Sequence, residues 1–494
     1  MKIFSQQQLK DWDKYTIQQQ HILSVDLMEM AANACLKWIL EHFQSNEFRI
    51  ICGHGDNGGD GLALARLLDN RKYSVKVYRI KSDRYSADNI SNLEKLKLTN
   101  VEMIENMDTF FDSITVNTVL IDAVFGTGLN KPLTGLPLTI IQKANLISCH
   151  KISIDIPSGL SSDNLLPAFS TAFKATNTLS FQAPKLAFMY PKNEAYVGEF
   201  EILDIGLDPT FTINTPSSYC YLQMEDINFI KKRNKFSHKG TFGHSLLIAG
   251  SAGKMGAAIL AAKACLKSGS GLLTAYTPKF GELILQISVP EAMSKTHEEE
   301  INFSNYNSIG IGPGLGITPS TKNLVASLMA NYHQPIVFDA DALTILNLNN
   351  ALNAIPKGSI LTPHPKEFDR MFGTSVSRAD QIQKGLEFVD KHLCYIVLKG
   401  AHTAIICPGG QVYFNATGNP AMAKGGSGDV LTGMLTAFLA QGYSSEHAAI
   451  LGVFLHGMAA DIALDETSEI SMMPSDLIAN IGKAWRKITK KVGV

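Results

Sequence analysis

The chain has 494 residues, of which 45% are hydrophobic and 18% charged, and its formal net charge is −1. This length predicts two or more packed domains, and the nearly neutral charge, without any basic block, argues against a nucleic-acid-binding protein. The seven cysteines are scattered and form no CxxC pair, which argues against a disulfide framework and against a zinc site of the usual spacing.

The N-terminus has no apolar signal core, and no run of about 18 apolar residues occurs anywhere. We therefore expect a cytoplasmic protein that binds neither nucleic acid nor a membrane. The first 45 residues predict helices, with Ser24 as a candidate N-cap for the helical pattern over 25–43.

The first half of the chain then alternates strands and helices. A buried strand at 48–52, a glycine-rich loop "GHGDNGGDG" at 53–61, a helix at 62–68 and a strand at 73–80 predict a βαβ unit with parallel strands. Strand-then-loop patterns recur in "VNTVLIDAVFGTG" at 116–128 and "HKISIDIPSG" at 150–159. In an open parallel sheet such strand ends collect at one edge, where ligands bind.

A Pro/Thr/Ser-rich stretch at 208–222 predicts a domain boundary, with domains over 1–215 and 223–494. Beyond it, strand-like runs end in Gly, Pro, Asp or His, and a long loop at 415–426 feeds a helix in a mostly helical C-terminus. We expect an α/β protein in which a Rossmann-like three-layer domain precedes a larger doubly wound α/β domain. The strand-like runs are 244–250, 272–278, 308–316, 335–343, 359–367 and 394–407.

The stretch "AKGGSGDVLTG" at 423–433 has the composition of an anion site. Gly425, Gly426 and Gly428 let backbone amides approach a phosphoryl group at a helix N-terminus. Asp429 beside that phosphate would repel it, and its natural task is to accept a proton from a hydroxyl that attacks phosphorus. The alternative is that Asp429 only complements the helix dipole.

Several motifs of the chain together resemble those of a known protein family. "NATGNPAMAKGGSGDVLTG" and "LTPHPKE", with "AGSAGKMGAA", "GIGPGLG", "FDADAL" and "LKGAHT" in the same order, resemble the kinase-like domain of the NAD(P)H-hydrate dehydratases over about 225–490. This domain belongs to the ribokinase-like superfamily. "GHGDNGGDG", "DAVFGTG" and "IDIPSG" resemble the NAD(P)H-hydrate epimerase domain over about 1–210, although Asp56 stands where the family more often has Asn. The two domains in this order resemble the bifunctional NAD(P)H-hydrate repair enzymes.

The resemblance implies a dehydratase that phosphorylates the C6 hydroxyl of the S hydrate, with ADP as co-substrate and Mg²⁺ on the phosphates. It implies that Asp429 is catalytic. His364 taken alone would more often be a structural loop histidine. We interpret Asp339 and Asp341 as strand-end caps and not as metal ligands. The implied hydrate contacts are Ala257, Gly316, His364 and Asp429, and the implied nucleotide contacts are Lys399, Gly400, Ala401, His402, Thr403 and Gly428.

For the first domain the resemblance implies inversion at C6 of the same hydrate, with Asp155 as the catalytic carboxylate. The implied hydrate contacts are Asp56, Asn57, Gly58, Gly59, Asp60, Gly126, Thr127, Gly128, Leu129, Asn130, Lys131, Pro132 and Asp155. Asn57, Asp122 and Ser158 are implied potassium ligands, and their oxygen chemistry suits a hard cation. Asp122 taken alone would instead be a carboxylate that caps a turn.

Two alternatives stay open. The chain could be a small-molecule kinase of the same superfamily that acts on a vitamin precursor, because fold does not fix substrate. The first domain could also be a binding module or scaffold without catalysis. In either case we expect a homo-oligomer, as is usual for α/β enzymes of this kind.

Overall fold

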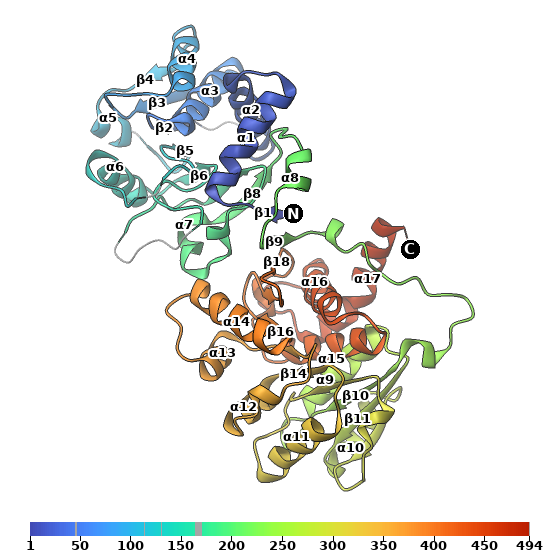
Figure 1. Ribbon diagram of the computed structural model, residues 1–494. Coiled ribbons are helices and arrows are strands. Elements are labelled where there is room, and N and C mark those ends of the chain that lie inside the picture. The colour runs from blue at the N-terminus through green and yellow to red at the C-terminus, as the bar shows by residue number, and fades with distance from the viewer. Residues whose placement is uncertain (45–46, 113, 130, 164–169, 494) are drawn as a thin grey trace. The chain divides into compact units, whose positions relative to one another are not determined.

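The computed structural model describes residues 1–44, 47–112, 114–129, 131–163 and 170–493. The chain separates into two compact units: one comprises Lys2–Tyr219, and the other comprises Met1 with Cys220–Val494. In Figure 1 the first unit is coloured from blue to green and the second from green to red. Among the described residues, no helix has the length and apolar character needed to cross a bilayer.

The Lys2–Tyr219 unit is built on a sheet in which all neighbouring strands run parallel, in the order β4-β3-β2-β5-β6-β7-β8. The order reverses between β2 and β5, so the carboxyl ends of these two strands form the switch point where ligands bind in such sheets. The strands are β2 (Glu47–Cys52), β3 (Val75–Arg79), β4 (Glu102–Met103), β5 (Thr118–Ala123), β6 (His150–Ile154), β7 (Asn177–Phe181) and β8 (Glu199–Leu203), with β1 (Lys2–Ile3) and β9 (Tyr219–Leu222) near the ends of this stretch of sequence.

Helices cover both faces of this sheet. Ile50 packs in the core formed with α2 and α3, whereas its neighbour Ile51 packs in the core formed with α5 and α6. This alternation is the period of a strand buried on both sides, and it produces the three layers that the sequence predicted. The helices are α1 (Gln6–Gln20), α2 (Ser24–His42), α3 (Asp56–Asn70), α4 (Ala87–Leu96), α5 (Met107–Asp112), α6 (Gly135–Leu146), α7 (Glu194–Val197) and α8 (Thr210–Asn214), with 3₁₀ turns η1 (Leu186–Met189) and η2 (Pro191–Asn193).

Two local predictions for this unit were wrong. The residues 56–61 form the start of α3 and not a loop, because Gly53 and Gly58 allow the helix to begin close to the sheet: a Cβ on Gly53 would lie 1.9 Å from the Val124 carbonyl oxygen. Ser24 does not cap α2. Leu23 holds the cap position, its N–H donates to Asp26, and the Ser24 hydroxyl donates to Asp88 instead.

The Cys220–Val494 unit has a mixed sheet in the order β18-β17-β16-β15-β14-β13-β10-β11-β12. Strands β16 to β12 of this order are parallel, whereas β16, β17 and β18 form an antiparallel meander. The order reverses between β10 and β13. The strands are β10 (His244–Ile248), β11 (Leu272–Thr277), β12 (Met293–Thr296), β13 (Ser308–Ile311), β14 (Ile336–Phe338), β15 (Ile360–Leu361), β16 (Tyr395–Leu398), β17 (Ala404–Ile406) and β18 (Val412–Asn415).

Helix α15 lies buried against both the sheet and α9. A Cβ on Gly433 would lie 2.0 Å from the Ala261 carbonyl oxygen of α9, and a Cβ on Gly310 of β13 would lie 2.2 Å from Thr436 of α15. The helices are α9 (Met255–Lys267), α10 (Lys279–Ser288), α11 (Pro319–Asn331), α12 (Ala340–Leu348), α13 (Pro365–Phe372), α14 (Arg378–His392), α15 (Ser427–Ala440), α16 (Ser445–Ala463) and α17 (Pro474–Val492), with 3₁₀ turns η3 (Met224–Asp226), η4 (Lys239–Phe242), η5 (Phe303–Asn305), η6 (Leu352–Ala354) and η7 (Pro420–Met422).

Candidate active sites

The glycine loop before α15 presents a rigid helix N-terminus. Gly426 is the N-cap with a φ of 104°, which favours glycine, and α15 begins at Ser427. The Ser427 hydroxyl donates to the Met422 carbonyl at 2.8 Å, and buried His456 contacts the Ser427 carbonyl at 2.9 Å through Nε2. Because burial lowers the pKa of His456 to about 4, this ring is neutral and its Nε2–H donates. The first-turn amides of α15 are therefore held in place for an anion.

Asp429 lies in the first turn of α15, and its carboxylate forms no hydrogen bond or ion pair with the described residues. Burial raises the pKa of Asp429 to about 6, the nearby charge of Asp339 raises it further, and Lys399 opposes both effects. A carboxyl group with this pKa is ionised at neutral pH yet basic enough to accept a proton from a hydroxyl.

Asp339 is the centre of a buried network beneath this site. One of its oxygens accepts from Lys399 at 2.6 Å and from Thr362 at 2.8 Å, and the other accepts from Thr432 of α15 at 2.7 Å. It occupies the N-cap position of α12 but makes no capping hydrogen bond, so the interpretation of its carboxylate as a cap was wrong. Asp341 accepts from the Gly316 N–H at 2.8 Å. In the described part of the chain, no group of three or more His, Cys, Asp or Glu side chains is arranged to hold a metal ion.

Five of the six predicted nucleotide contacts, residues 399–403, form the turn between β16 and β17, an antiparallel hairpin that the sequence did not reveal. Lys399 at the end of β16 lies against α15: a Cβ on Gly428 would be 3.1 Å from its Nζ. The Thr403 hydroxyl donates to the Gly400 carbonyl, and His402 contacts the Asn415 carbonyl through Nδ1. The structure thus brings Lys399 and Gly428 together, and it directs the His402 ring toward β18.

Buried Arg378 of α14 supports this turn from below. Its guanidinium donates to the carbonyls of Leu398 and Lys399 at 2.9 and 3.1 Å. Burial lowers the pKa of Arg378 to about 10, so it stays charged at neutral pH. No sequence motif singled out Arg378.

His364 caps α13 through its ring. Its Nδ1 accepts from the N–H groups of Lys366 and Glu367 at 3.1 and 3.3 Å, so the proton is on Nε2. Its own N–H donates to the Glu367 carboxylate, which completes a capping box. The structural role that the sequence left open is therefore real. The His364 side chain is about half exposed, and its Nε2 lies 3.5 Å from a Glu367 carboxylate oxygen.

Ala257 and Gly316 lie at the switch point between β10 and β13. The loop after β10 binds the loop after β13, since the Ser251 hydroxyl donates to the Gly314 carbonyl at 2.6 Å. A Cβ on Gly314 would lie 3.0 Å from the Ala257 Cβ, and Gly316 has a φ of 79°. Through Asp341 this corner is electrostatically connected to Asp429.

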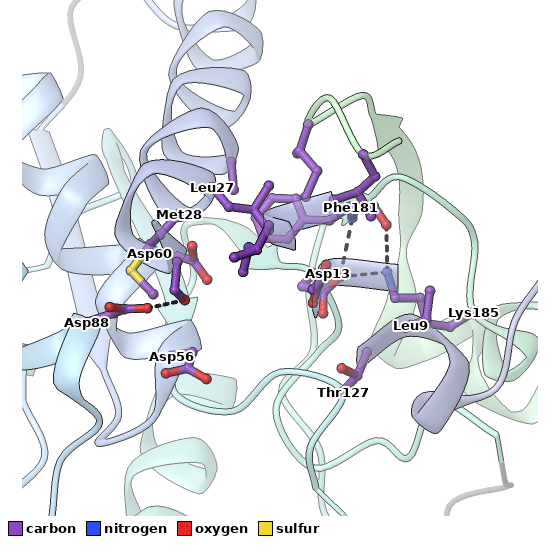
Figure 2. A pocket seen from close by; sticks show the side chains of 16 residues that line it. Leu9, Asp13, Leu27, Met28, Asp56, Asp60, Asp88, Thr127, Phe181 and Lys185 are labelled. Carbon is purple, nitrogen blue, oxygen red and sulfur yellow. Dashed lines mark hydrogen bonds and ion pairs between the residues drawn. The ribbon is translucent and has the colours of Figure 1, made fainter. Parts of the chain in front are cut away.

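In the Lys2–Tyr219 unit, one cavity of about 150 Å³ collects five carboxylates and one lysine. Figure 2 shows Asp13 and Lys185 on one side of it, and Asp56, Asp60 and Asp88 on the other. The fifth carboxylate belongs to Asp155. The lining residues are Leu9, Asp13, Ile17, Ser24, Leu27, Met28, Ala31, Asp56, Asp60, Asp88, Thr127, Asp155, Phe181, Lys185, Ile205 and Leu207.

Asp155 is held in a strained backbone conformation directly after β6. Its φ is 66°, which is uncommon for a residue other than glycine. Lys185 forms an ion pair with it at 2.6 Å, and the Phe181 N–H donates to the same oxygen at 3.3 Å. Lys185 is itself buried and donates to the Ser180 hydroxyl and to the Phe181 and Ala183 carbonyls. This arrangement aims Asp155 into the cavity and leaves its other oxygen without a protein partner among the described residues.

Asp122 and Ser158 lie side by side below the switch point. The two oxygens of buried Asp122 accept from the Ser158 hydroxyl at 2.6 Å, the Ser158 N–H at 2.8 Å, the Ser153 hydroxyl and the Val124 N–H. Burial raises the pKa of Asp122 to about 6, although these hydrogen bonds oppose the shift. Asn57 packs against Gly126, and its buried Nδ2 has no hydrogen-bond partner in the described structure.

The remaining predicted hydrate contacts divide into two groups. The cavity lining includes four of them: Asp56, Asp60, Thr127 and Asp155. Asn130 lies outside the described residues. Lys131 and Pro132 are exposed. The residues that are not in the cavity lining are Asn57, Gly58, Gly59, Gly126, Gly128, Leu129, Lys131 and Pro132.

Sequence reasoning missed Asp13, Asp88 and Lys185 in this cavity. Each lies on a segment outside the glycine motifs: Asp13 on α1, Asp88 on α4, and Lys185 in the turn after β7. Asp13 stands in "KDWDKYT" and Asp88 in "YSADNIS", where charged and polar residues are ordinary on a helix surface, so neither stretch signals a site.

Comparison with known proteins places both units. Residues 245–483 match the family model described as NAD(P)H-hydrate dehydratase, and residues 24–187 match the model described as YjeF-related protein N-terminus. The chain is 33% identical over 518 aligned residues to a bifunctional NAD(P)H-hydrate repair enzyme of Moorella thermoacetica, covering 97% of this chain and 96% of that one. It is 34% identical to the enzyme of the same name from Thermofilum pendens, covering 89% and 87% of the two chains.

A solved structure agrees for the second unit. A ribokinase-like superfamily protein from Enterococcus faecalis shares 29% identity with a TM-score of 0.51, and the match covers 56% of this chain and 98% of that one. The predicted ribokinase-like fold of the larger unit is therefore confirmed.

Proposed function

This chain belongs to the family of bifunctional NAD(P)H-hydrate repair enzymes, and from that premise we propose how its two units divide the work. The Lys2–Tyr219 unit interconverts the R and S hydrates of the reduced nicotinamide cofactors. The other unit dehydrates the S form and so restores NADH or NADPH. A hydrate has a hydroxyl on C6 of its ring and has lost the ring double bond there, so it cannot serve in hydride transfer.

The start of α15 is the observation that supports the dehydratase proposal. Its amides and Lys399 bind the terminal phosphoryl group of ADP, while Asp429 takes the proton of the C6 hydroxyl. The hydroxyl oxygen bonds to phosphorus and AMP leaves. The ring nitrogen then expels phosphate as the C6–O bond breaks, and loss of a proton from C5 restores the double bond. The step converts a poor leaving group into a good one.

We propose that ADP lies over the turn at Lys399–Thr403, with Mg²⁺ on its phosphates. Magnesium supplies charge neutralisation to phosphoryl transfer. The chain supports this with one cation, Lys399, held by Asp339 beside the amides of α15, so that the anionic donor meets a positive environment.

A nucleotide requirement tests this proposal. Purified protein, freed of bound nucleotide, is mixed with the S hydrate, and recovery of the reduced-nicotinamide absorbance is followed with and without ADP. We expect recovery only when ADP or a close analogue is present. Dehydration at full rate in nucleotide-free buffer would overturn the phosphorylation step.

For the epimerase, the acidic cavity around Asp155 supports binding of the hydrate ring. Its carboxylates suit the hydroxyl and carboxamide donors of that ring and repel the pyrophosphate, which belongs outside at the glycine loops. We propose K⁺ at Asn57, Asp122 and Ser158. The donor set of oxygens supports this proposal because such donors suit a hard cation, and the buried Asn57 amide nitrogen has no hydrogen-bond partner in the described structure.

The rival activity is phosphorylation of a vitamin-precursor alcohol. The two functions separate in one assay, in which a thiazole or pyrimidine alcohol with ATP replaces the hydrate with ADP. In this alternative the first unit is a binding module or scaffold. A scaffold needs neither a strained Asp155 nor its buried Lys185 partner, so the cavity of the first unit favours hydrate repair.

A further inference from the structure

The epimerase cavity contains more acid groups than the predicted mechanism uses. One oxygen of Asp155 is held by Lys185 through a 2.6 Å ion pair, which suits this carboxylate to electrostatic stabilisation of the ring. Asp13 of α1 lines the same cavity, and its carboxyl group forms no hydrogen bond or ion pair with the described residues. A group that must give and take a proton needs this freedom.

The charge of the cavity indicates which intermediate it stabilises. Five acidic side chains face one ammonium group there, so carboxylates outnumber it even when Asp13 holds a proton. Such a cavity favours a cation over a neutral or anionic species. Cleavage of the C6–O bond of the hydrate, with the ring nitrogen donating its lone pair to form N1=C6, produces a planar cationic ring.

We propose that Asp13 is a catalytic acid–base residue of the epimerase, and that it protonates the C6 hydroxyl of the R hydrate so that this group leaves as water. This inference rests on the proposed epimerase function. The C6–O electron pair goes to oxygen, the Asp13 proton goes to the same oxygen, and N1=C6 forms. A water molecule then adds to the opposite face, N1 regains its lone pair, and the extra proton passes to a carboxylate across the cavity.

The arrangement in Figure 2 suits two-sided proton transfer. Asp13 lies on one side with Lys185, while Asp56, Asp60 and Asp88 lie on the other. Asp60 is 9% exposed and lines the cavity, and burial together with the charges of Asp155 and Asp56 raises its pKa, so this group retains a proton. The acceptor on that side is the carboxylate of Asp88, which accepts from the Ser24 hydroxyl. One proton leaves Asp13 and one arrives across the cavity, and solvent exchange restores the starting state.

The charges around Asp13 supply a usable acidity. Burial raises the pKa of Asp13 to about 7, the charges of Asp155 and Asp56 raise it further, and Lys185 lowers it. The carboxylates of Asp60 and Asp88 face the same cavity. Asp13 is therefore partly protonated at neutral pH, and conversion of R to S should slow as pH rises through about 7, because the protonated form is lost.

The test uses the full chain and a sample of R hydrate from which the S form has been removed. The appearance of S is followed chromatographically without nucleotide, and the spontaneous rate is subtracted at each pH. Asp13→Asn should slow this reaction by about 10²–10⁴-fold, the usual effect of losing a general acid, and should remove the alkaline fall. Asp13→Glu should retain the fall with a reduced rate.

The matched control is Asp11→Asn on the same helix, where an exposed carboxylate accepts from Gln7 and from no other described residue; this variant should match the native protein. Calorimetric binding of the R hydrate shows whether the Asp13→Asn variant is folded. Near-native turnover in Asp13→Asn, or a slower rate that still falls above pH 7, would overturn the proposal; in the second case Asp60→Asn identifies the true acid. A native protein that never epimerises would instead refute the proposed function.

Discussion

We expect dehydration to depend on Asp429. Asp429→Asn removes the proton acceptor but leaves the backbone amides of α15 unchanged, so turnover should fall by about 10²–10⁴-fold while ADP binding stays close to native. In the native protein turnover should rise with pH through about 6, since the carboxyl must be ionised to act as a base. Steady-state rates and ADP calorimetry check both points. A variant with native turnover would show that Asp429 only complements the helix dipole.

Asp339 should control the acidity of that base. Its charge raises the pKa of Asp429, and its ion pair holds Lys399 away from full interaction with the catalytic carboxylate. In Asp339→Asn both effects change in the same direction, so the acid limb of the dehydration profile should move to lower pH. The profile of kcat against pH measures this shift. A limb that does not move would mean that Asp339 only supports Thr432 and Thr362.

Among single residues, the sequence singles out those inside motifs and does not reveal their partners. Asp429 and Asp155 stand out in the sequence because glycine loops and a family pattern surround them, and their catalytic roles stay predictions. The roles of Lys185 and Asp339 could not be predicted, because they come from contacts with Asp155 and with Thr432 that only the folded chain creates. In the sequence, Asp13 is only an acidic residue on a predicted helix. Its place in the cavity lining follows from the packing of α1 in the folded chain.

The position of α15 depends on glycine contacts with neighbouring elements. In Gly433→Ala the new Cβ would meet the Ala261 carbonyl at 2.0 Å, and the backbone of α9 cannot yield as a flexible side chain would. We expect destabilisation of about 1–3 kcal/mol together with lower dehydratase turnover, because Asp429 moves with the helix. Thermal unfolding and steady-state rates measure the two effects.

Gly482→Ala is the matched control for this change. Gly482 lies within α17, and nothing stands within 4 Å of a Cβ there. The substitution should stabilise the protein by about 0.5–1 kcal/mol because alanine favours the helix. If both variants had equal stability, the close packing of α15 on α9 would not explain the glycine at 433.

The sequence predicted helices and strands correctly where buried strands alternate with helices. It was wrong where glycines serve close packing or a reversal of the chain. Residues 56–61 suggested a loop, yet their glycines serve close packing of the first turns of α3 against β5 and its neighbours. The run at 394–407 suggested one strand, yet its "KGAHT" turn reverses the chain between β16 and β17. Glycine permits both outcomes, so composition alone does not separate them.

For the whole molecule, the two units share a ligand and no site residue. The proposed epimerase residues lie within Lys2–Tyr219, and the proposed dehydratase residues lie within Cys220–Val494. Substitutions at sites that share no residue or partner act nearly independently. Asp155→Asn should therefore spare dehydration of the S hydrate and slow consumption of the R hydrate, because Lys185 loses its ionised partner in the cavity.

The measurement uses mixed epimers with excess ADP, followed by absorbance. Native protein should clear both forms, with R drained through S, whereas the variant should show a fast phase for S and a slow tail set by spontaneous epimerisation. Exchange of K⁺ for a larger organic cation should produce the same tail in native protein if Asn57, Asp122 and Ser158 hold the ion, because only the first unit contains them. A variant that consumes both epimers at the native rate would remove Asp155 from catalysis and favour a scaffold role for its unit.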